Sequence, residues 1–397
     1  MNIFIVAGEA SGDLHGSNLI KSLKEIDQSL VFYGIGGEKM KSLGFDAIED
    51  SRELAVVGIS EVFLKLGRLF TAFNKLKKAL DERRPDVVVL IDYPDFNLHF
   101  AREAKKRRIP VIYYIGPQVW AWRKGRVKKI ARLVDKMLVV FPFEVDIYQK
   151  AGVDVEYVGH PLSATVSSQF SKDGALAEFG MAQCQTVALL PGSRRDEVNR
   201  LLPVMLEAAA IIKREIKDIQ FILPLADTIE QVFVEDIIRD VGCEKSFFRL
   251  PSPTSCLRIV SGRLYEALRA SDAAIVASGT ATLETALMEI PMVIVYKLSF
   301  LTAIIGRIFV HIDDVGLPNI VAGRRIVPEL IQEYATPSAI AENILRILKD
   351  KGEREKMISE LKEVGKRLGK VDASRNAAEK IYKVTTQNSK RKSQNLN

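Results

Sequence analysis

The sequence predicts an α/β protein with two successive parallel-sheet domains, closed by helices at the C-terminus. Short, almost continuous apolar runs such as IFIVAGE (3–9) and VVVLID (87–92) alternate with amphipathic helical patterns. Such runs are typical of parallel strands in a sheet that helices cover on both faces. The pattern begins again at about Val187, and the 397 residues of the chain exceed what one hydrophobic core usually supports. Two domains are therefore expected.

The same pattern sets the expected boundaries. The domains should span residues 1–165 and 166–370, followed by a closing helix over 371–386 and a basic, disordered tail over 387–397. In open α/β sheets, ligands bind beyond the carboxyl ends of the strands. Functional residues are therefore expected in the loops that follow the apolar runs.

Composition narrows the class of protein. With 47% hydrophobic and 27% charged residues, the chain is neither disordered nor fibrous. Its three cysteines lack disulfide or metal-ligand spacing, and its start lacks a secretory pattern, so a cytoplasmic location is expected. The longest apolar stretch (298–310) contains Arg307 and is too short to span a bilayer. A net charge of +7 favours anionic partners, namely nucleotide phosphates, acidic lipids or nucleic acid.

LLPGSRRDEV (189–198) has the features of an anion site. A buried strand ends in a turn at Gly192, Ser193 is a candidate cap, and a helix begins with free N–H groups that attract anions. Arg194 adds a bidentate donor for phosphate. The alternative is an ordinary capped helix with arginines that face solvent.

ASGTATLETALMEIP (277–291) offers a second turn of this kind. The strand ends at Gly279, Thr280 and Thr282 bring hydroxyls to a helix start, and Glu284 is placed to accept the ribose hydroxyls of a nucleotide. The alternative is a helix N-terminus stabilised by an acidic residue. Together the two turns predict a site for a nucleotide diphosphate in the second domain.

The first domain carries different groups. IDYPDFN (91–97) places Asp92 and Asp95 beyond a strand, where a carboxylate can act as a general base, although aspartates that cap turns are common. Glu9 and Asp13 follow the first strand without a dinucleotide or Walker pattern, so nucleotide binding there is disfavoured. The chain contains no Asp-x-Asp pair, and its four histidines are scattered, so neither a metal nor another cofactor is expected.

Taken together, these strings resemble the lipid-A-disaccharide synthases, a family of inverting transferases with the GT-B fold, in which two Rossmann-like domains face a cleft. The resemblance covers all of the chain except the tail. It is carried by AGEASGD, IDYPDFN, GPQVWAW, FPFE (141–144), VGHP (158–161), LPGSR, ASGTATLE and GLPN (316–319). It implies the joining of UDP-2,3-diacylglucosamine to 2,3-diacylglucosamine 1-phosphate in a β-1,6 linkage, with release of UDP and without a metal.

The resemblance also implies roles for matching residues. Asp95 would be the catalytic carboxylate, Arg194 would stabilise the leaving diphosphate, and Asn319 would face the cleft. The nucleotide would contact Ser193, Arg194, Ser278, Gly279, Thr280, Thr282 and Glu284. The acceptor would contact Glu9, Asp13, Gln118 and Trp120.

Acylated substrates imply a membrane surface. In the segment 60–80, apolar residues at helical spacing lie alongside lysines, which is typical of an interfacial helix. A helix that faces the core fits this pattern equally well, but the acyl chains favour peripheral binding to the cytoplasmic face of the inner membrane. The expected membrane contacts are Phe63, Leu66, Phe70 and Phe73. A homodimer is left open, and no nucleic acid is expected as a partner.

Three rival functions remain at this point. Another GT-B transferase or an epimerase acting on UDP-N-acetylglucosamine would not require acyl chains for turnover. A nucleic-acid-binding protein would show binding that is sensitive to salt. A non-catalytic lipid-binding protein would bind acylated sugar without releasing UDP.

Overall fold

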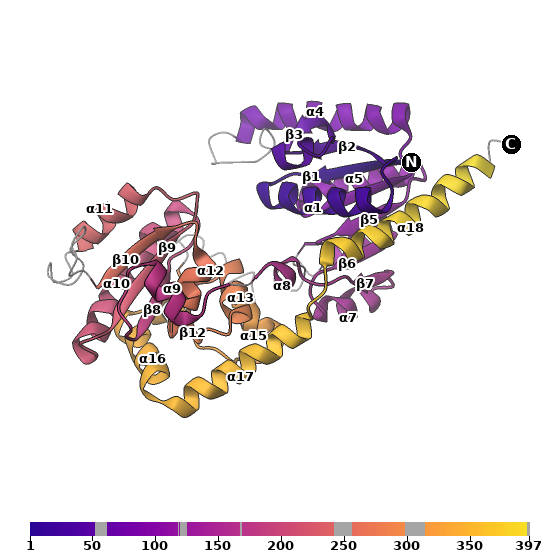
Figure 1. The fold of residues 1–397 in the computed structure, drawn as a ribbon. Coiled ribbons are helices and arrows are strands. Elements are labelled where there is room, and N and C mark those ends of the chain that lie inside the picture. The colour runs from indigo at the N-terminus through magenta and orange to yellow at the C-terminus, as the bar shows by residue number, and fades with distance from the viewer. Residues whose placement is uncertain are drawn as a thin grey trace. The chain divides into compact units, whose positions relative to one another are not determined.

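The computed structural model describes residues 1–51, 62–117, 119, 125–166, 169–241, 256–297 and 314–394. The chain forms two compact units, one made of Met1–Ala164 with Gly369–Asn397 and the other of Thr165–Leu368. Each unit contains a parallel sheet with helices packed on it, so the predicted α/β class is confirmed (Figure 1). The last part of the chain, predicted as a separate closing helix and tail, belongs to the first unit.

The sheet of the first unit reverses its strand order beside β1. Its strands are β1 (Asn2–Ala7), β2 (Val31–Gly36), β3 (Asp46–Asp50), β4 (Val87–Ile91), β5 (Val111–Tyr114), β6 (Lys136–Val139) and β7 (Val155–Tyr157). They lie in the order β3-β2-β1-β4-β5-β6-β7, and β1 pairs in parallel with both β2 and β4. The switch point of this sheet, where a ligand is expected, therefore lies between β1 and β4.

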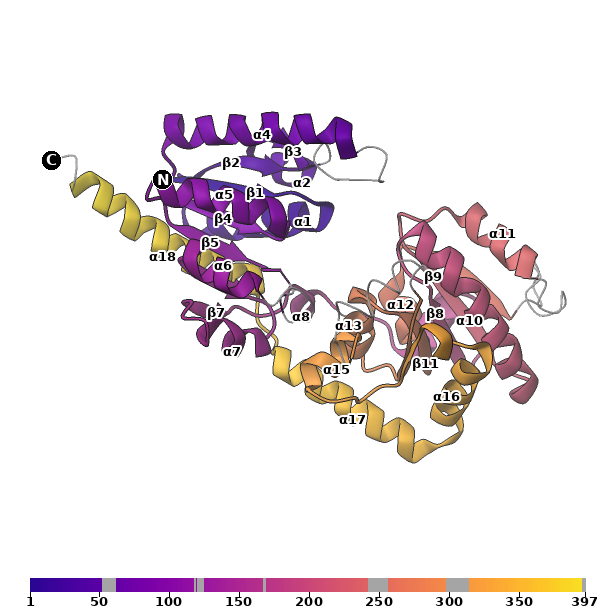
Figure 2. The same ribbon diagram turned by 180° about the vertical axis from the view of Figure 1, so that it is seen from behind.

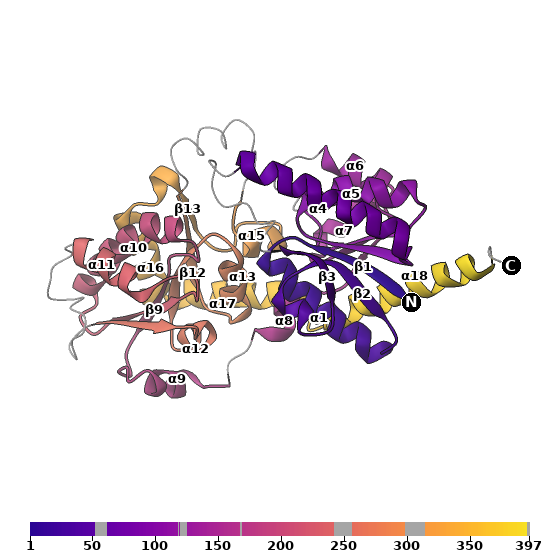
Figure 3. The ribbon, with the colours of Figure 1, turned by 90° about the horizontal axis from the view of Figure 1, so that it is seen from above.

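Helices cover both faces of this sheet. They are α1 (Ala10–Ile26), α2 (Glu38–Lys41), α4 (Val62–Arg83), α5 (Pro94–Lys106), α6 (Arg126–Leu133), α7 (Phe143–Gln149) and α18 (Ala373–Gln394). The short helix α8 (Pro161–Thr165) contains the point at which the chain passes into the second unit. Figure 3 shows α4, α5 and α6 on one side of the sheet and α1 on the other. Because successive side chains of a strand point to opposite faces, Phe4 and Val6 of β1 pack under α4 and α5.

The C-terminal helix α18 is anchored to the start of β4. Asn388 Nδ2 donates to the Asp86 carbonyl at 2.7 Å, and Lys392 Nζ lies 3.0 Å from Asp86 Oδ1. Lys392 Nζ also donates to the carbonyls of Arg84 and Pro85. With these partners the helix continues to Gln394, where the sequence pattern predicts a disordered tail from residue 387.

The second unit repeats the arrangement. Its strands are β8 (Thr186–Leu190), β9 (Gln220–Leu225), β10 (Leu257–Ser261), β11 (Ala273–Ala277), β12 (Met292–Tyr296) and β13 (Glu329–Ile331). Their order is β10-β9-β8-β11-β12-β13, which puts the switch point between β8 and β11. The helices are α9 (Lys172–Glu178), α10 (Arg195–Glu215), α11 (Gln231–Val241), α12 (Leu264–Arg269), α13 (Thr280–Leu287), α15 (Leu317–Ala322), α16 (Pro337–Lys349) and α17 (Lys351–Leu368). Helix α10 packs against α16, and Figure 2 shows the two side by side.

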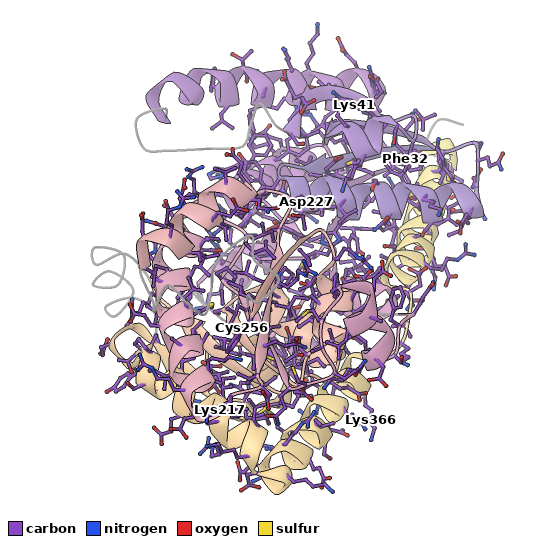
Figure 4. The ribbon with its side chains drawn as sticks, turned by 60° about the vertical axis from the view of Figure 1, so that its left-hand side comes forward. Phe32, Lys41, Lys217, Asp227, Cys256 and Lys366 are labelled. Atoms are coloured by element: carbon purple, nitrogen blue, oxygen red, sulfur yellow. The ribbon has the colours of Figure 1, made fainter. Side chains whose placement is uncertain are left out.

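The carboxyl edge of the second sheet is easy to locate in Figure 4. Asp227 follows the end of β9, and Lys217 precedes its start; the figure labels them at opposite ends of this unit. The turns that follow β8 and β11 lie at the Asp227 edge, because all strands of the sheet are parallel. Among the described residues, no helix is long and apolar enough to cross a membrane.

Candidate functional site

The two turns predicted to bind a nucleotide are neighbours in the structure. Strands β8 and β11 pair in parallel, with Val276 opposite Leu190, so the chain leaves both strands at the same edge of the sheet. One turn leads into α10 and the other into α13. Two helix N-termini therefore begin side by side at the switch point, where unpaired N–H groups favour an anion.

Gly192 shapes the first turn. Its φ of +116° is unfavourable for residues with a side chain, and a Cβ there would lie 2.6 Å from Glu197 Oε2. Arg194, with an extended backbone, is the N-cap of α10 and makes no side-chain capping bond. The expected cap role of Ser193 is therefore wrong. The Arg194 side chain is 81% exposed and lies 3.6 Å from Glu197, so it retains donors for a ligand.

In the second turn, Gly279 and Thr280 are exposed to solvent, whereas Thr282 is buried. Gly279 has a φ of +149°, and a Cβ there would meet nothing within 4 Å; Thr280 beside it is exposed. Thr282, by contrast, is fully buried, and its hydroxyl donates to the Gly279 carbonyl at 2.7 Å. The Thr282 hydroxyl thus stabilises the turn from inside, and the expected contact of Thr282 with the nucleotide stays a prediction. Ser278 Oγ likewise donates to the Val315 carbonyl at 3.0 Å.

Glu284 lies in the second turn of α13 and is half-buried. The Tyr265 hydroxyl donates to Glu284 Oε1 at 3.0 Å. Burial raises the pKa of the Glu284 carboxyl, and the Tyr265 hydrogen bond opposes this rise. A partly desolvated carboxylate beside an open helix N-terminus is suited to accept the hydroxyls of a ribose.

Asn319 holds the backbone of its own unit together. Its side chain is 0% exposed, and Nδ2 donates to the Val327 carbonyl at 3.0 Å and to Glu329 Oε1 at 2.7 Å. Its Oδ1 accepts from the N–H groups of Ile326 and Val327. Every polar atom of the Asn319 side chain thus has an internal partner, which gives the residue a structural role, and its expected catalytic role stays a prediction.

The switch point of the first unit carries backbone strain. Asp92 and Tyr93, directly after β4, have consecutive φ values of +49° and +45°, a conformation that costs about 1–2 kcal/mol per residue. The Asp92 carbonyl accepts from Asn97 Nδ2 and from the Tyr113 hydroxyl, each at 2.6 Å. Burial raises the pKa of the Asp92 carboxyl, and the charge of Glu9, which follows β1, raises it further. Strain of this kind is common at functional sites.

The other acidic candidates in this unit have different surroundings. The Asp95 side chain is 73% exposed and lies 2.5 Å from the Arg126 guanidinium. Asp13 is buried, and its carboxylate accepts from the N–H groups of Gly37, Lys39 and Met40 at the start of α2. Asp13 therefore caps α2, and its expected contact with the acceptor stays a prediction.

The predicted membrane contacts separate into two kinds. Phe70 is 69% exposed, whereas Phe73 is partly buried, with its ring centroid 5.7 Å from that of Phe96 and 6.1 Å from that of Phe100. Phe73 thus packs against the core of its unit, and its expected contact with the membrane stays a prediction. The side chains of Phe63 and Leu66 lie outside the described residues, as do Gln118 and Trp120.

Comparison with known proteins identifies the family. The family model described as lipid-A-disaccharide synthetase matches residues 3–383. The chain belongs to this family. Lipid-A-disaccharide synthase of Syntrophus aciditrophicus is 48% identical over 377 residues, which cover 95% of this chain and 96% of that protein. The enzyme of the same name from Geobacter metallireducens is 47% identical, with 95% of each chain covered. The protein is thus a glycosyltransferase of lipid A biosynthesis.

Solved structures agree on the fold of this synthase family member. UDP-GlcNAc 2-epimerase from Neisseria meningitidis, bound to UDP-GlcNAc, has a TM-score of 0.63 at 13% identity and covers 96% of this chain and 100% of its own. A glycosyltransferase of kitacinnamycin has a TM-score of 0.62 at 14% identity, covering 96% and 98%. At such identities the likeness shows the fold alone, namely two parallel-sheet α/β domains of the GT-B type, as predicted.

Two features of this lipid-A-disaccharide synthetase chain could not be found from the sequence. Tyr265 lies in an ordinary helical pattern, and nothing in that pattern indicates a contact with Glu284, nineteen residues further on. The left-handed pair Asp92–Tyr93 precedes a proline, which signals a turn but not its conformation.

Among the described residues, no group of three or more His, Cys, Asp or Glu side chains is placed to hold a metal ion.

Proposed function

We propose that the chain transfers 2,3-diacylglucosamine from UDP to the 6-hydroxyl of 2,3-diacylglucosamine 1-phosphate, forming a β-1,6 linkage and releasing UDP. Family membership gives the synthesis of a lipid A disaccharide by glycosyl transfer. The observation that carries the donor assignment is the pair of open turns at the β8–β11 switch point, with Arg194 on one and Glu284 close behind the other.

The second unit would bind the donor through its nucleotide. The N–H groups at the starts of α10 and α13 attract the diphosphate, and the exposed Arg194 guanidinium adds a bidentate contact. Glu284 accepts the ribose hydroxyls. These groups are fixed before the reaction, so they stabilise the negative charge that grows on the departing diphosphate. The same groups take the place of a metal ion in this proposal.

The first unit would supply the general base, and its geometry supports Asp92 over Asp95. Asp92 is held by the strained turn, and burial with the Glu9 charge raises its pKa. A raised pKa makes a carboxylate a better proton acceptor near neutral pH. Asp95 is exposed, and its carboxylate is already engaged by the Arg126 guanidinium. We therefore assign the base to Asp92, although the family resemblance implies Asp95.

The chemical step is a single displacement. The base removes the proton of the acceptor 6-hydroxyl while that oxygen bonds to the anomeric carbon of the donor. The bond from this carbon to the β-phosphate oxygen breaks on the opposite face, and UDP leaves with the electron pair. The α-linked donor then gives a β-linked product, and the proton remains on the carboxyl group until solvent accepts it.

We also propose that the protein binds the cytoplasmic face of the inner membrane, because the acyl chains of both sugars hold the substrates there. Phe70, exposed on α4, is the described apolar side chain that supports it. On α6 of the same unit, Lys128 and Arg132 are exposed and suited to anionic headgroups.

One experiment tests this function. Purified protein is incubated with the two acylated sugars, and mass spectrometry follows a disaccharide 1-phosphate together with UDP. The proposal expects both products in equal amounts and none when the acceptor is omitted. Conversion of the UDP-sugar without an acceptor, or turnover that is unaffected by removing the acyl chains, would contradict it.

A further inference from the structure

We infer that Tyr265 is a positioning residue for the nucleotide, and that its hydroxyl holds the Glu284 carboxylate in place to accept the ribose hydroxyls. This inference rests on the proposed nucleotide site and adds to it a residue that contacts no ligand itself. Tyr265 lies on α12, whereas Glu284 lies on α13, so the hydrogen bond joins two elements that flank β11 in the sequence.

The hydrogen bond from Tyr265 leaves the Glu284 carboxylate able to accept the hydroxyls of a ribose. The Tyr265 hydroxyl reaches Oε1 at 3.0 Å, a normal length for this hydrogen bond. A carboxylate has about four acceptor positions on its two oxygens. One donor from Tyr265 therefore fixes the rotamer of Glu284 and still leaves positions for both hydroxyls of a ribose.

A second hydroxyl contacts Tyr265. Burial raises the pKa of Tyr265, and a hydrogen bond with Thr165, the first residue of the second unit, opposes this rise. Because the Glu284 carboxylate can only accept, the single Tyr265 proton points to Glu284, and the Tyr265 oxygen accepts from Thr165. The order of donation is thus Thr165 to Tyr265 to Glu284, and donors in such a chain strengthen one another.

This chain of donors counteracts the cost of burying Glu284. Burial raises the pKa of the carboxyl and the Tyr265 hydrogen bond lowers it, so the hydroxyl helps to keep Glu284 ionised. Of the charged groups on the helices packed against α13, Lys362 pairs with Glu289 beyond the end of α13. Arg367 donates to the carbonyls of Val321 and Ala322 on α15. Within the part of the chain that the structure describes, the Tyr265 hydrogen bond is the interaction that opposes the rise in the pKa of Glu284.

The test measures UDP binding by calorimetry between pH 5.5 and pH 8. Tyr265→Phe removes only the hydroxyl, and we expect UDP affinity to fall roughly tenfold, as loss of a hydrogen bond to a charged group predicts. The pH below which affinity declines should be higher in this variant than in the wild type, because its Glu284 protonates sooner. With 2′-deoxy-UDP the penalty should shrink, since one ribose hydroxyl is missing. Tyr334→Phe, at an exposed tyrosine of the same unit, is the matched control.

The outcomes separate this inference from the proposed function. If Glu284→Gln leaves UDP affinity unchanged, the proposed ribose contact itself is wrong. If Glu284→Gln weakens binding but Tyr265→Phe matches the wild type at every pH, the role of Tyr265 is overturned. An equal penalty for UDP and 2′-deoxy-UDP would also overturn it, because it would indicate packing alone. Should Tyr265→Phe fold poorly, Thr165→Val replaces it, and an unchanged pH profile there overturns the inference.

Discussion

Asn319 Nδ2 donates to Glu329 Oε1 at 2.7 Å, and this bond joins helix α15 to the edge strand β13. Glu329 also accepts from the N–H groups of Val315 and Gly316, so the two side chains together hold the backbone on both sides of the GLPN motif. The GLPN motif therefore has a structural role in this unit, whatever Asn319 contributes to the reaction.

The first prediction concerns this pair. Asn319→Ala should lower the free energy of unfolding by about 1–3 kcal/mol, because several buried backbone groups lose their partner. Thermal denaturation of the purified variant measures the loss. A variant with wild-type stability but strongly reduced turnover would return Asn319 to the reaction.

The second prediction assigns the general base. Asp92→Asn should reduce turnover by about 10²–10⁴-fold with UDP binding intact, because the carboxylate that accepts the proton is lost. Since burial raises the pKa of Asp92, wild-type turnover should be present above that pKa and fall as the pH drops through it. Asp95→Asn is the matched control and should keep this acid limb. A shift of the acid limb in the control would move the base to Asp95.

The third prediction concerns the diphosphate. Arg194→Ala should weaken UDP binding by roughly ten- to a hundredfold, since a charged donor to phosphate is removed. Arg195→Ala in the same turn is the control, because the Arg195 guanidinium lies 4.0 Å from the centroid of the Phe233 ring and is engaged there. Equal losses for the two variants would indicate a general charge effect and not a contact by Arg194.

The fourth prediction separates two phenylalanines on α4. Phe70→Ser should reduce sedimentation with anionic vesicles and leave the melting temperature unchanged, because the Phe70 ring is 69% exposed. Phe73→Ser should destabilise the fold by about 3 kcal/mol, because its ring packs against Phe96 and Phe100. Loss of stability in the Phe70 variant would mean that this side chain also belongs to the core.

The fifth prediction is that turnover needs no divalent metal. Activity should persist in EDTA, because Arg194 and the helix N-termini stabilise the leaving diphosphate in the proposed reaction. The assay compares initial rates with and without the chelator. Activity that disappears and returns only with magnesium or manganese would refute this account of the leaving group.

The sequence alone predicts much of the fold, because buried parallel strands leave an unmistakable apolar run. Strands β1, β4, β8 and β11 each coincide with such an apolar run. The strand order does not follow from them, since pairing depends on contacts between distant segments. The sequence therefore predicts the turn after β8 and the turn after β11 separately, and only the structure shows that the two turns are neighbours.

Within the site, the sequence predicts the motif better than the role of each side chain. Thr280 and Thr282 are two residues apart, so on a helix they point about 200° apart, and only one of them can be exposed. Which one depends on where the helix begins, and the structure places Gly279 at the N-cap. The same limit applies to Asp13, whose partners on α2 lie more than twenty residues away.

The anchoring of α18 to Asp86 has a consequence for synthesis on the ribosome. The segment Thr165–Leu368 is continuous and is translated in full before α18 emerges, so the second unit can fold while the first still lacks a helix. Until then, α1 has an apolar surface that Ala377, Ala378 and Ile381 later cover. Nascent chains that stop short of the last two dozen residues will therefore expose this surface to chaperones and proteases.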